Sequence, residues 1–279
     1  MDTASQRIVV TGANGRLGTA TCELFASLGL DFVGTDISVQ STTTFEVVTA
    51  DLRDYDEVRT VLDGAHAVVH LGNHPGLGNT PPHLIFNENV AINENVFQCA
   101  SELGLTHIVF ASTIQLFGSK PDLRTVSHPP TRPPFPITSD TVLAPSNLYS
   151  LSKQVSEVML KFYAERCGLT TTALRLPLLH HNERHFTVST GNETEHDVFE
   201  GFTSLTYTDA AELILAVLRS DLDGFNAFSA GVADRHLDLE LSELASTFFP
   251  ELPPHTKHLI DSTPIYSTTG WWPTPSAWK

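Results

Sequence analysis

The chain has few cysteines, few basic residues and no long hydrophobic run, and each shortage excludes a class of protein. Its three cysteines, Cys22, Cys99 and Cys167, form no CxxC pair, so we expect reduced, mostly buried thiols rather than a disulfide framework. Lys and Arg number 16 against 32 Asp and Glu, and the formal net charge of −16 disfavours nucleic acid as a partner. No stretch reaches the roughly 18 apolar residues that a membrane helix needs. We therefore expect a cytoplasmic protein that binds neither nucleic acid nor a membrane.

Short apolar runs alternate with longer amphipathic runs through the first two-thirds of the 279 residues. This alternation indicates βαβ units and a parallel sheet, and the near-continuous apolar strands indicate helices on both faces. The sequence therefore predicts an α/β fold with a doubly wound parallel Rossmann sheet. Expected strands lie at 7–11, 31–35, 45–48, 67–71, 108–111 and 171–176, and expected helices at 17–28, 55–62, 84–103 and 148–167.

The pattern loosens after residue 176, which predicts a second, smaller unit. Residues 206–231 hold an expected helix at 207–218 and an expected strand at 224–229, and we assign them to the main domain with residues 1–176. Residues 177–205 and 232–279, with a short helix expected at 239–248, form a predicted small C-terminal substrate-binding lobe. Residues 119–147 carry seven prolines and are interpreted as a long surface loop beside the site.

Three glycines follow the first expected strand and open the first helix. Gly12, Gly15 and Gly18 lie in the segment TGANGRLG. In a dinucleotide site, such glycines make the tight turn, admit the pyrophosphate and let helix and strand pack closely, while the helix N-terminus attracts the phosphates. A glycine triplet alone is also compatible with a plain turn, but its place between strand and helix favours the dinucleotide site. The expected contacts are Gly12, Asn14, Gly15, Arg16, Leu17 and Gly18.

Asp36 ends the second expected strand, 18 residues after Gly18. A carboxylate there accepts hydrogen bonds from the adenosine ribose and repels a 2′-phosphate, which favours NAD over NADP. The alternative is a solvated aspartate at a strand end. Asp51 and Leu52 follow the third expected strand and are expected to face the adenine, with an ordinary helix N-cap as the alternative for Asp51. The main domain is therefore interpreted as an NAD-binding Rossmann domain.

A tyrosine and a lysine lie four residues apart in the segment YSLSK, so Tyr149 and Lys153 share one face of the expected helix 148–167. A free tyrosine has a pKa of about 10, and a nearby ammonium favours the phenolate. The phenol can then take a proton from an alcohol or return it to a carbonyl. Such a pair is by itself common on helix surfaces. The hydroxyls of Ser112 and Thr113, at the end of the fifth strand, support a catalytic role because ligands bind at that edge of the sheet.

The order of these motifs resembles the extended branch of the short-chain dehydrogenase/reductase superfamily, of the NAD-dependent epimerase/dehydratase type. The resemblance implies NAD as the cofactor, a roughly seven-stranded Rossmann sheet and a homodimer through the helices at 84–103 and 148–167. The matching segments cover nearly the whole chain: TGANGRLG at 11–18, Asp36, Asp51-Leu52, VVHLGN at 68–73, NVAINENVFQCA at 89–100, IVFASTIQLFG at 108–118, YSLSK at 149–153, LRLP at 174–177, YTDAAELI at 207–214 and GWWP at 270–273.

The resemblance also implies roles for single residues. It makes Tyr149 the acid/base, Lys153 its partner and the anchor of the nicotinamide ribose, and Thr113 the hydroxyl that holds the substrate oxygen. Besides Tyr149 and Lys153, the further cofactor contacts that it implies are Leu71, Gly72, Asn73, Asn89, Ala111, Ser112 and Pro177.

Departures from the family narrow the reaction. Nucleotide-sugar dehydratases follow this threonine with Asp and Glu, whereas this chain has Ile114 and Gln115, which argues against dehydration. Only 126 residues follow Lys153, fewer than in typical nucleotide-sugar epimerases, and the compact layout resembles the uronate dehydrogenase type. The expected substrate contacts are His74, Asn182, Thr113 and Arg184, of which Arg184 is suited to pair with a carboxylate unless it is a solvated loop residue.

The sequence thus predicts an NAD-dependent oxidoreductase or epimerase that acts on a hydroxyl or carbonyl carbon of a sugar, sugar acid or nucleotide-sugar. Whether the hydride stays on the cofactor or returns to the substrate is open. The alternative is a non-catalytic NAD-binding sensor on the same fold. His180, His181 and His185 cluster in the expected substrate segment, but no cysteine or carboxylate scaffold accompanies them, so we expect no metal.

Overall fold

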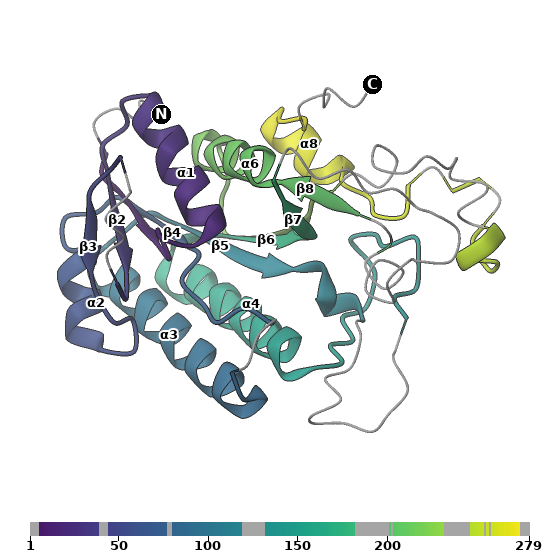
Figure 1. The fold of residues 1–279 in the computed structure, drawn as a ribbon, viewed down its shortest axis with the longest axis horizontal. Helices are drawn as coiled ribbons and strands as arrows, with labels where there is room; N and C mark the ends of the chain where they lie inside the picture. The colour runs from purple at the N-terminus through teal and green to yellow at the C-terminus, as the bar shows by residue number, and fades with distance from the viewer. Residues whose placement is uncertain are drawn as a thin grey trace.

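A seven-stranded parallel sheet forms the centre of the molecule, with the strand order β3-β2-β1-β4-β5-β6-β9 (Figure 1). The computed structural model describes residues 6–38, 44–76, 80–118, 132–181, 201, 203–231, 246–253, 255–256 and 258–273. The strands are β1 (Ile8–Thr11), β2 (Phe32–Asp36), β3 (Val47–Thr49), β4 (Ala67–His70), β5 (His107–Thr113), β6 (Thr170–Leu176) and β9 (Phe225–Ser229). The helices are α1 (Arg16–Ser27), α2 (Tyr55–Leu62), α3 (Pro82–Glu102), α4 (Leu148–Cys167), α6 (Tyr207–Arg219) and α8 (Thr263–Thr269).

Helices cover both faces of the sheet, as the apolar strands predict. One core cluster joins the sheet to α1 and α6 through side chains such as Phe25 and Leu213. The other joins it to α2, α3 and α4 through side chains such as Leu62, Phe97 and Leu160. Figure 1 shows the two helix layers on opposite sides of the strands. The predicted doubly wound α/β fold is therefore confirmed.

The sequence predicts the bounds of α2 and α4 to the residue, because local capping residues set them. Asp54 caps α2, because its side chain accepts hydrogen bonds from the backbone N–H groups of Asp56 and Glu57. Asn147 and Ser150 form a reciprocal capping box that starts α4, and Gly168 ends that helix in the left-handed conformation at φ 72°. Asn147 lies two residues before Tyr149, and its cap fixes the start of α4 at Leu148.

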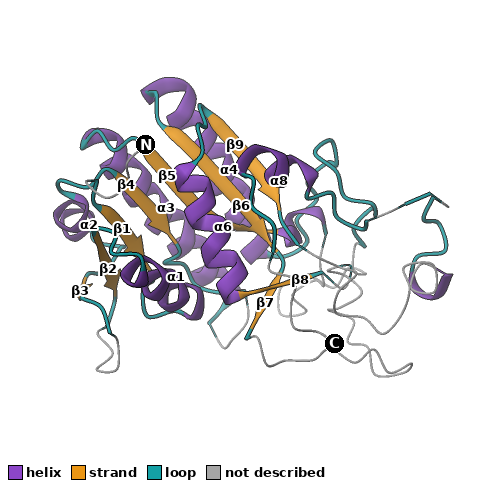
Figure 2. Ribbon diagram, turned by 90° about the horizontal axis from the view of Figure 1, so that it is seen from above, coloured by secondary structure: helices purple, strands orange, loops and turns teal. Residues whose placement is uncertain are grey.

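The structure contains several elements that the sequence did not predict. A separate two-stranded parallel sheet consists of β7 (Leu178–His180) and β8 (Ser204–Thr206), which lie side by side outside the main sheet (Figure 2). A short 3-10 helix, η2 (Ile114–Phe117), follows β5 directly. Residues 246–248 are helical, as expected for the end of the helix at 239–248, whose other residues lie outside the described part.

The prediction of a surface loop at 119–147 is wrong for part of the described residues 132–147. Ile137 is 1% exposed and packs in a small core with Ile114, Phe117 and Ile260. Its N–H donates to the carbonyl of Leu259 at 2.8 Å, and its carbonyl accepts from the N–H of Asp261 at 2.8 Å. The physical reason is that one strand-like residue pairs with a segment distant in sequence, which proline content cannot indicate.

The cysteine prediction holds for two of the three residues. Cys22 and Cys99 are buried, and burial raises the pKa of the Cys22 thiol to about 12, whereas Cys167 is exposed. Within the described ranges, no helix combines the length and the apolar character needed to cross a membrane.

Candidate active site

The carboxyl ends of β1, β4 and β5 meet at one edge of the sheet, because the strands are parallel and adjacent. The glycine segment after β1, the loop after β4 and the first turns of α1 and α4 gather there. This is the edge at which open α/β sheets bind ligands. Most of the site residues predicted from the sequence lie at this edge.

The glycines of the loop between β1 and α1 are needed for close approach. Gly12 has φ +67°, and a Cβ atom there would lie 2.8 to 2.9 Å from the backbone of Leu71 and Gly72. A Cβ atom at Gly18 would lie 2.0 Å from the carbonyl oxygen of Gly12. Gly15 is exposed and is the N-cap of α1, where no side chain caps the first turn. The first backbone N–H groups of α1 are thus left for an anionic ligand, as the phosphate-binding prediction requires.

Asp36 closes this loop on the β2 side. Its carboxylate accepts hydrogen bonds from the N–H groups of Asn14 at 3.0 Å and of Ile37 at 2.8 Å. The Asn14 amide nitrogen donates to the carbonyl of Ser38, while its buried Oδ1 has no partner among the described residues. Asp36 forms no ion pair with any described residue, so its negative charge is not compensated there. This environment fits ribose hydroxyls and disfavours a 2′-phosphate.

Two other predicted residues of the loop face α6 and the core. The Arg16 guanidinium hydrogen bonds to the Tyr207 hydroxyl, which raises the pKa of Arg16. Leu17 is partly buried and packs against the core on the α1 and α6 side. Whether either residue contacts a cofactor stays a prediction.

The N-cap alternative for Asp51 is wrong, because Asp54 caps α2. Asp51 instead accepts hydrogen bonds from the Arg53 guanidinium, at 2.9 Å from Nε and 2.7 Å from Nη2. These bonds hold the pKa of the Asp51 carboxyl below its usual range. Leu52 is buried and lies against Gly72, where a Cβ atom would be 2.7 Å from the leucine Cδ1.

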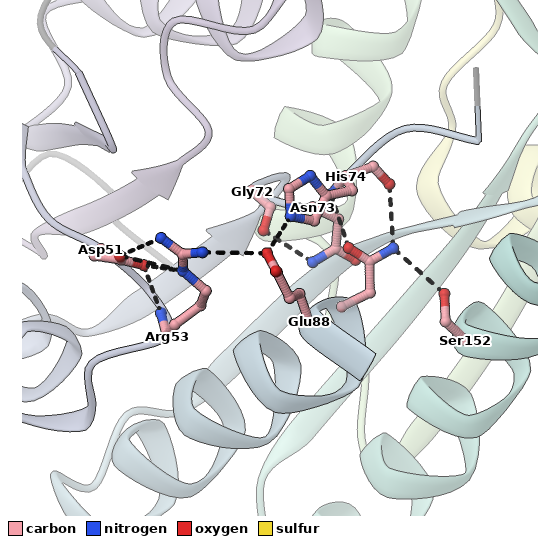
Figure 3. A network of polar contacts seen from close by, with 8 residues as sticks. Asp51, Arg53, Gly72, Asn73, His74, Glu88 and Ser152 are labelled. Atoms are coloured by element: carbon pink, nitrogen blue, oxygen red, sulfur yellow. Dashed lines mark hydrogen bonds and ion pairs between the residues drawn. The ribbon is translucent and has the colours of Figure 1, made fainter. Parts of the chain in front are cut away.

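A line of polar contacts joins this region to the loop after β4. Glu88 on α3 lies between Arg53 and His74, accepting from Arg53 Nη1 at 3.3 Å and contacting His74 Nε2 at 2.7 Å (Figure 3). Asn89, on the next position of α3, binds the backbone of His74 in both directions, at 2.7 and 3.1 Å. The Asn89 side chain is fully buried and therefore supports the loop, and its direct contact with a cofactor stays a prediction.

Tyr149 and Lys153 lie in the first two turns of α4, where the sequence places them. Lys153 is 3% exposed, and its Nζ donates to the Oδ1 of Asn73 at 2.7 Å and to the carbonyl of Ala111 at 2.8 Å. The same Nζ lies 5.7 Å from the centroid of the Tyr149 ring. Burial lowers the pKa of Lys153 to about 7. Gly76 leaves room for the tyrosine, because a Cβ atom there would lie 2.7 Å from Tyr149 Cδ1.

The two hydroxyls at the end of β5 differ in their surroundings. Ser112 donates to Glu157 on α4 at 2.6 Å, so its hydroxyl hydrogen is committed to the protein interior. Thr113 accepts from the N–H of Gln115 at 3.2 Å, a bond that leaves its own hydroxyl hydrogen available. This difference favours Thr113 over Ser112 as the donor to a substrate oxygen.

Sequence reasoning did not identify Glu157 and Arg175 as part of this region. Arg175 on β6 binds Glu157 through two contacts, at 3.0 and 2.7 Å, and their side chains are 11% and 5% exposed. A signal was present, since Glu157 lies four residues after Lys153 and therefore shares its helix face. The arginine belongs to the segment LRLP, in which the sequence prediction singled out only Pro177, which is buried.

The histidine cluster and the substrate residues predicted after β6 are only partly within the described part. His180 is buried and His181 lies with its ring centroid 4.9 Å from that of Tyr207. Asn182, Arg184 and His185 lie outside the described residues. Among the residues that are described, no group of three or more His, Cys, Asp or Glu side chains is placed to hold a metal ion.

Comparison with known proteins gives a consistent family. The sequence model of the NAD dependent epimerase/dehydratase family matches residues 8–185. The chain is 26% identical to the NAD-dependent glucose-6-phosphate dehydrogenase of Haloferax volcanii over 235 residues, which cover 78% of this chain and 82% of that protein. It is 29% identical to the uronate dehydrogenase of Pseudomonas putida over 181 residues, which cover 62% of this chain and only 61% of that protein.

Solved structures share the fold over nearly the whole chain. A short-chain dehydrogenase/reductase superfamily protein from Agrobacterium tumefaciens, solved with bound NAD, is 21% identical with a TM-score of 0.70, covering 96% of this chain and 92% of that one. Uronate dehydrogenase from the same organism is 23% identical with a TM-score of 0.64, covering 98% and 91%. At such identities these structures establish the common fold.

Proposed function

Since this chain belongs to the NAD-dependent epimerase/dehydratase family, we propose that it is a dehydrogenase that oxidises a hydroxyl carbon of a small sugar, sugar acid or sugar phosphate. The protein is an NAD-dependent enzyme of the short-chain dehydrogenase/reductase type, and NAD is its cofactor. The observation that carries the proposal is the placement of the buried Lys153 ammonium beside Tyr149 at the edge of the sheet where β5 ends.

The residues of this chain fit the cofactor. The backbone of Gly12 to Gly18 and the uncapped first turn of α1 would hold the pyrophosphate, and Asp36 would accept from the adenosine ribose. The buried and unpartnered Oδ1 of Asn14 offers a further acceptor next to Asp36. Leu52, Leu71 and Gly72 would line the adenosine side. When bound, NAD supplies the acceptor for the hydride that leaves the substrate carbon.

In this proposal, Tyr149 takes the proton from the substrate hydroxyl. Its phenol must be ionised to accept a proton, and a free phenol is not ionised near neutral pH because its pKa is about 10. The ammonium of Lys153 on the same helix face stabilises the phenolate. Thr113 would donate its hydroxyl hydrogen to the substrate oxygen and so hold that oxygen within reach of Tyr149.

Several observations support a small substrate and oxidation. Ile114 and Gln115 provide no acidic pair for water elimination, and both lie in η2 next to Thr113. Two relatives are named for dehydrogenation of a sugar phosphate and of a uronate. Arg184 would bind the carboxylate or phosphate of such a substrate, with Asn182 and His74 as further contacts, although the ring of His74 is engaged by Glu88.

A spectrophotometric screen tests the proposal. Purified protein is incubated with NAD and a panel of free sugars, uronic acids, sugar phosphates and UDP-sugars, and absorbance at 340 nm is followed. NADH formation with a free sugar, uronic acid or sugar phosphate supports the proposal. Conversion of a UDP-sugar to its epimer without net NADH would replace it by an epimerase. NAD binding with neither reaction would favour the sensor.

We also infer that the protein is a homodimer through α3 and α4. Val158 and Phe162 lie one turn apart on α4 and are 65% and 55% exposed, and Leu84 on α3 is 37% exposed. The two helices lie side by side on the same face of the sheet (Figure 1). Burying these apolar side chains against the same surface of a second copy would remove them from water.

A further inference from the structure

Three buried polar side chains and the partly buried Asn73 connect the end of β1 to the catalytic helix. Thr11, His70 and Asn93 are each 0% exposed and come from β1, β4 and α3. Thr11 Oγ1 and His70 Nδ1 are 2.7 Å apart, and His70 Nε2 and Asn93 Oδ1 are also 2.7 Å apart. Asn73 continues the chain, because its Nδ2 donates to Asn93 Oδ1 at 2.6 Å and its Oδ1 accepts from Lys153 Nζ at 2.7 Å.

The positions of the hydrogens follow from the number of donors at Thr11. Its hydroxyl oxygen already accepts from the N–H groups of Leu71 and Gly72, each at 3.1 Å. A hydroxyl has two acceptor positions and one hydrogen, so that hydrogen points to His70 Nδ1. His70 must then carry its hydrogen on Nε2 and donate it to Asn93. Burial lowers the pKa of His70 to about 3, so the ring stays neutral.

Asn93 is fixed from its other end as well. Its Nδ2 donates to Ser156 Oγ at 2.6 Å, and Ser156 donates to the carbonyl of Ser152 at 2.7 Å. The Asn93 oxygen is therefore directed at Asn73 and cannot exchange places with the nitrogen without losing both bonds. The Asn73 side-chain nitrogen in turn donates to Asn93 and to the carbonyl of Gly72 at 2.8 Å, and Figure 3 shows the bond to Gly72. Only its oxygen is left for Lys153.

We propose that Asn73 is a positioning residue that holds the Lys153 ammonium through its side-chain oxygen, in an orientation imposed by the buried chain from Thr11 through His70 and Asn93. The inference rests on the proposed role of Lys153 in catalysis. It assigns to the Asn73 side chain a task separate from any backbone contact with the cofactor. The chain also connects the cofactor loop to the catalytic helix, because Thr11 binds the N–H groups of the loop after β4.

The proposal predicts that Asn73 tunes the protonation of Lys153. A neutral oxygen at 2.7 Å favours the charged ammonium, which burial disfavours. Other titratable groups face Lys153 from the elements around it. These groups are the neutral His70 on β4 and Tyr149 on α4. Glu157 lies one turn further along α4 and is paired with Arg175. Glu88 on α3 is bound by Arg53 and His74.

A titration of Lys153 itself provides the test. The chain has five lysines, Lys120, Lys153, Lys161, Lys257 and Lys279, so protein labelled with ¹³Cε-lysine gives a small set of NMR signals. A Lys153→Met variant assigns the signal of interest, and the measurement uses the full chain without added cofactor. Asn73→Asp should move the midpoint of the Lys153 titration up by roughly one pH unit or more, and Asn73→Ala should move it down.

Matched variants separate positioning from general effects. Asn87→Asp adds the same charge at an exposed position of α3 and should leave the midpoint unchanged. Asn93→Leu should lower the Lys153 midpoint, as Asn73→Ala should. It also provides the test if Asn73→Asp does not fold. An unchanged Lys153 midpoint in folded Asn73 and Asn93 variants would overturn the proposal. So would a ¹⁵N NMR spectrum showing His70 protonated on Nδ1.

The outcome is independent of the proposed function. Shifted Lys153 midpoints together with no dehydrogenase activity on any sugar would reject the function and keep the positioning role. Dehydrogenase activity with unshifted midpoints would reject the positioning role alone.

Discussion

The Nζ atom of Lys153 lies 5.7 Å from the ring centroid of Tyr149, one helical turn away on the same face of α4. Two acceptors hold it there, the side-chain oxygen of Asn73 and the carbonyl of Ala111. Burying an ammonium next to a phenol costs stability, and the charge is useful only if it acts on that phenol.

The stability of the cofactor-free protein should rise with pH above neutrality because of Lys153. Burial lowers its pKa to about 7 in the folded chain, whereas an unfolded lysine has a pKa of about 10.4. Between these values the unfolded chain binds more protons, so stability rises with pH, and below pH 7 the burial of the charge costs stability in full. The measurement is urea unfolding from pH 6 to 9.5. Lys153→Met should reduce the rise, and parallel curves for both proteins would contradict the assignment.

The ion pair between Glu157 and Arg175 should be needed for folding. Arg175→Met leaves the Glu157 carboxylate, which is 5% exposed, without its ion-pair partner. We expect the free energy of unfolding to fall by about 3–5 kcal/mol. Chemical denaturation measures it. The matched control is Glu165→Gln, which removes the exposed pair with Lys161, where each side chain is 59% exposed, and should cost less than about 1 kcal/mol. Equal effects of the two substitutions would show that burial does not matter here.

Asp36 should set the preference for NAD over NADP. Asp36→Ser removes the uncompensated charge next to the loop of Asn14, and the ratio of kcat/KM for NAD to that for NADP should fall by roughly tenfold. Asp31→Ser, which removes an aspartate just before β2 begins, at the opposite end of that strand, should leave the ratio unchanged. A higher kcat/KM with NADP than with NAD in the unaltered protein would contradict this role of Asp36.

The dimer should depend on the exposed face of α4. The Phe162 side chain is 55% exposed and would be buried by a second copy in the dimer. Phe162→Glu would place a charge in that interface, so the protein should become a monomer. Light scattering after gel filtration measures the mass. Lys161→Glu, at an exposed neighbouring position, is the control for added charge. A monomeric unaltered protein would reject the proposed homodimer.

Much of the fold follows from the sequence because local patterns specify it. The capping residues Asp54 and Asn147 and the glycine at position 168 fix α2 and α4 to the residue, and the apolar strands require a sheet covered on both faces. The strands β7 and β8 have three residues each and carry no periodic pattern. Among the described residues they pair with one another alone, so their pairing arises from tertiary structure.

The candidate site follows from the sequence less completely. The glycine loop and the Tyr149 and Lys153 pair are local motifs, and the structure places them together at one sheet edge. The orientations of Ser112 and Asn89 could not be predicted, because each side chain is committed to a partner on another element. The chain from Thr11 to Lys153 spans four separate segments, which only the fold brings into contact.

Catalysis by Tyr149 is tested by comparing the unaltered protein with Tyr149→Phe. Turnover is followed at 340 nm with the substrate found in the screen, and NAD binding is measured by calorimetry in the same samples. We expect Tyr149→Phe to lower kcat by roughly 10² to 10⁴ while the Kd for NAD changes little, because the hydroxyl moves a proton. Tyr163→Phe on the same helix should retain full activity, since it lies among Phe97 and Phe162, away from the site. Undiminished turnover in Tyr149→Phe would contradict the account.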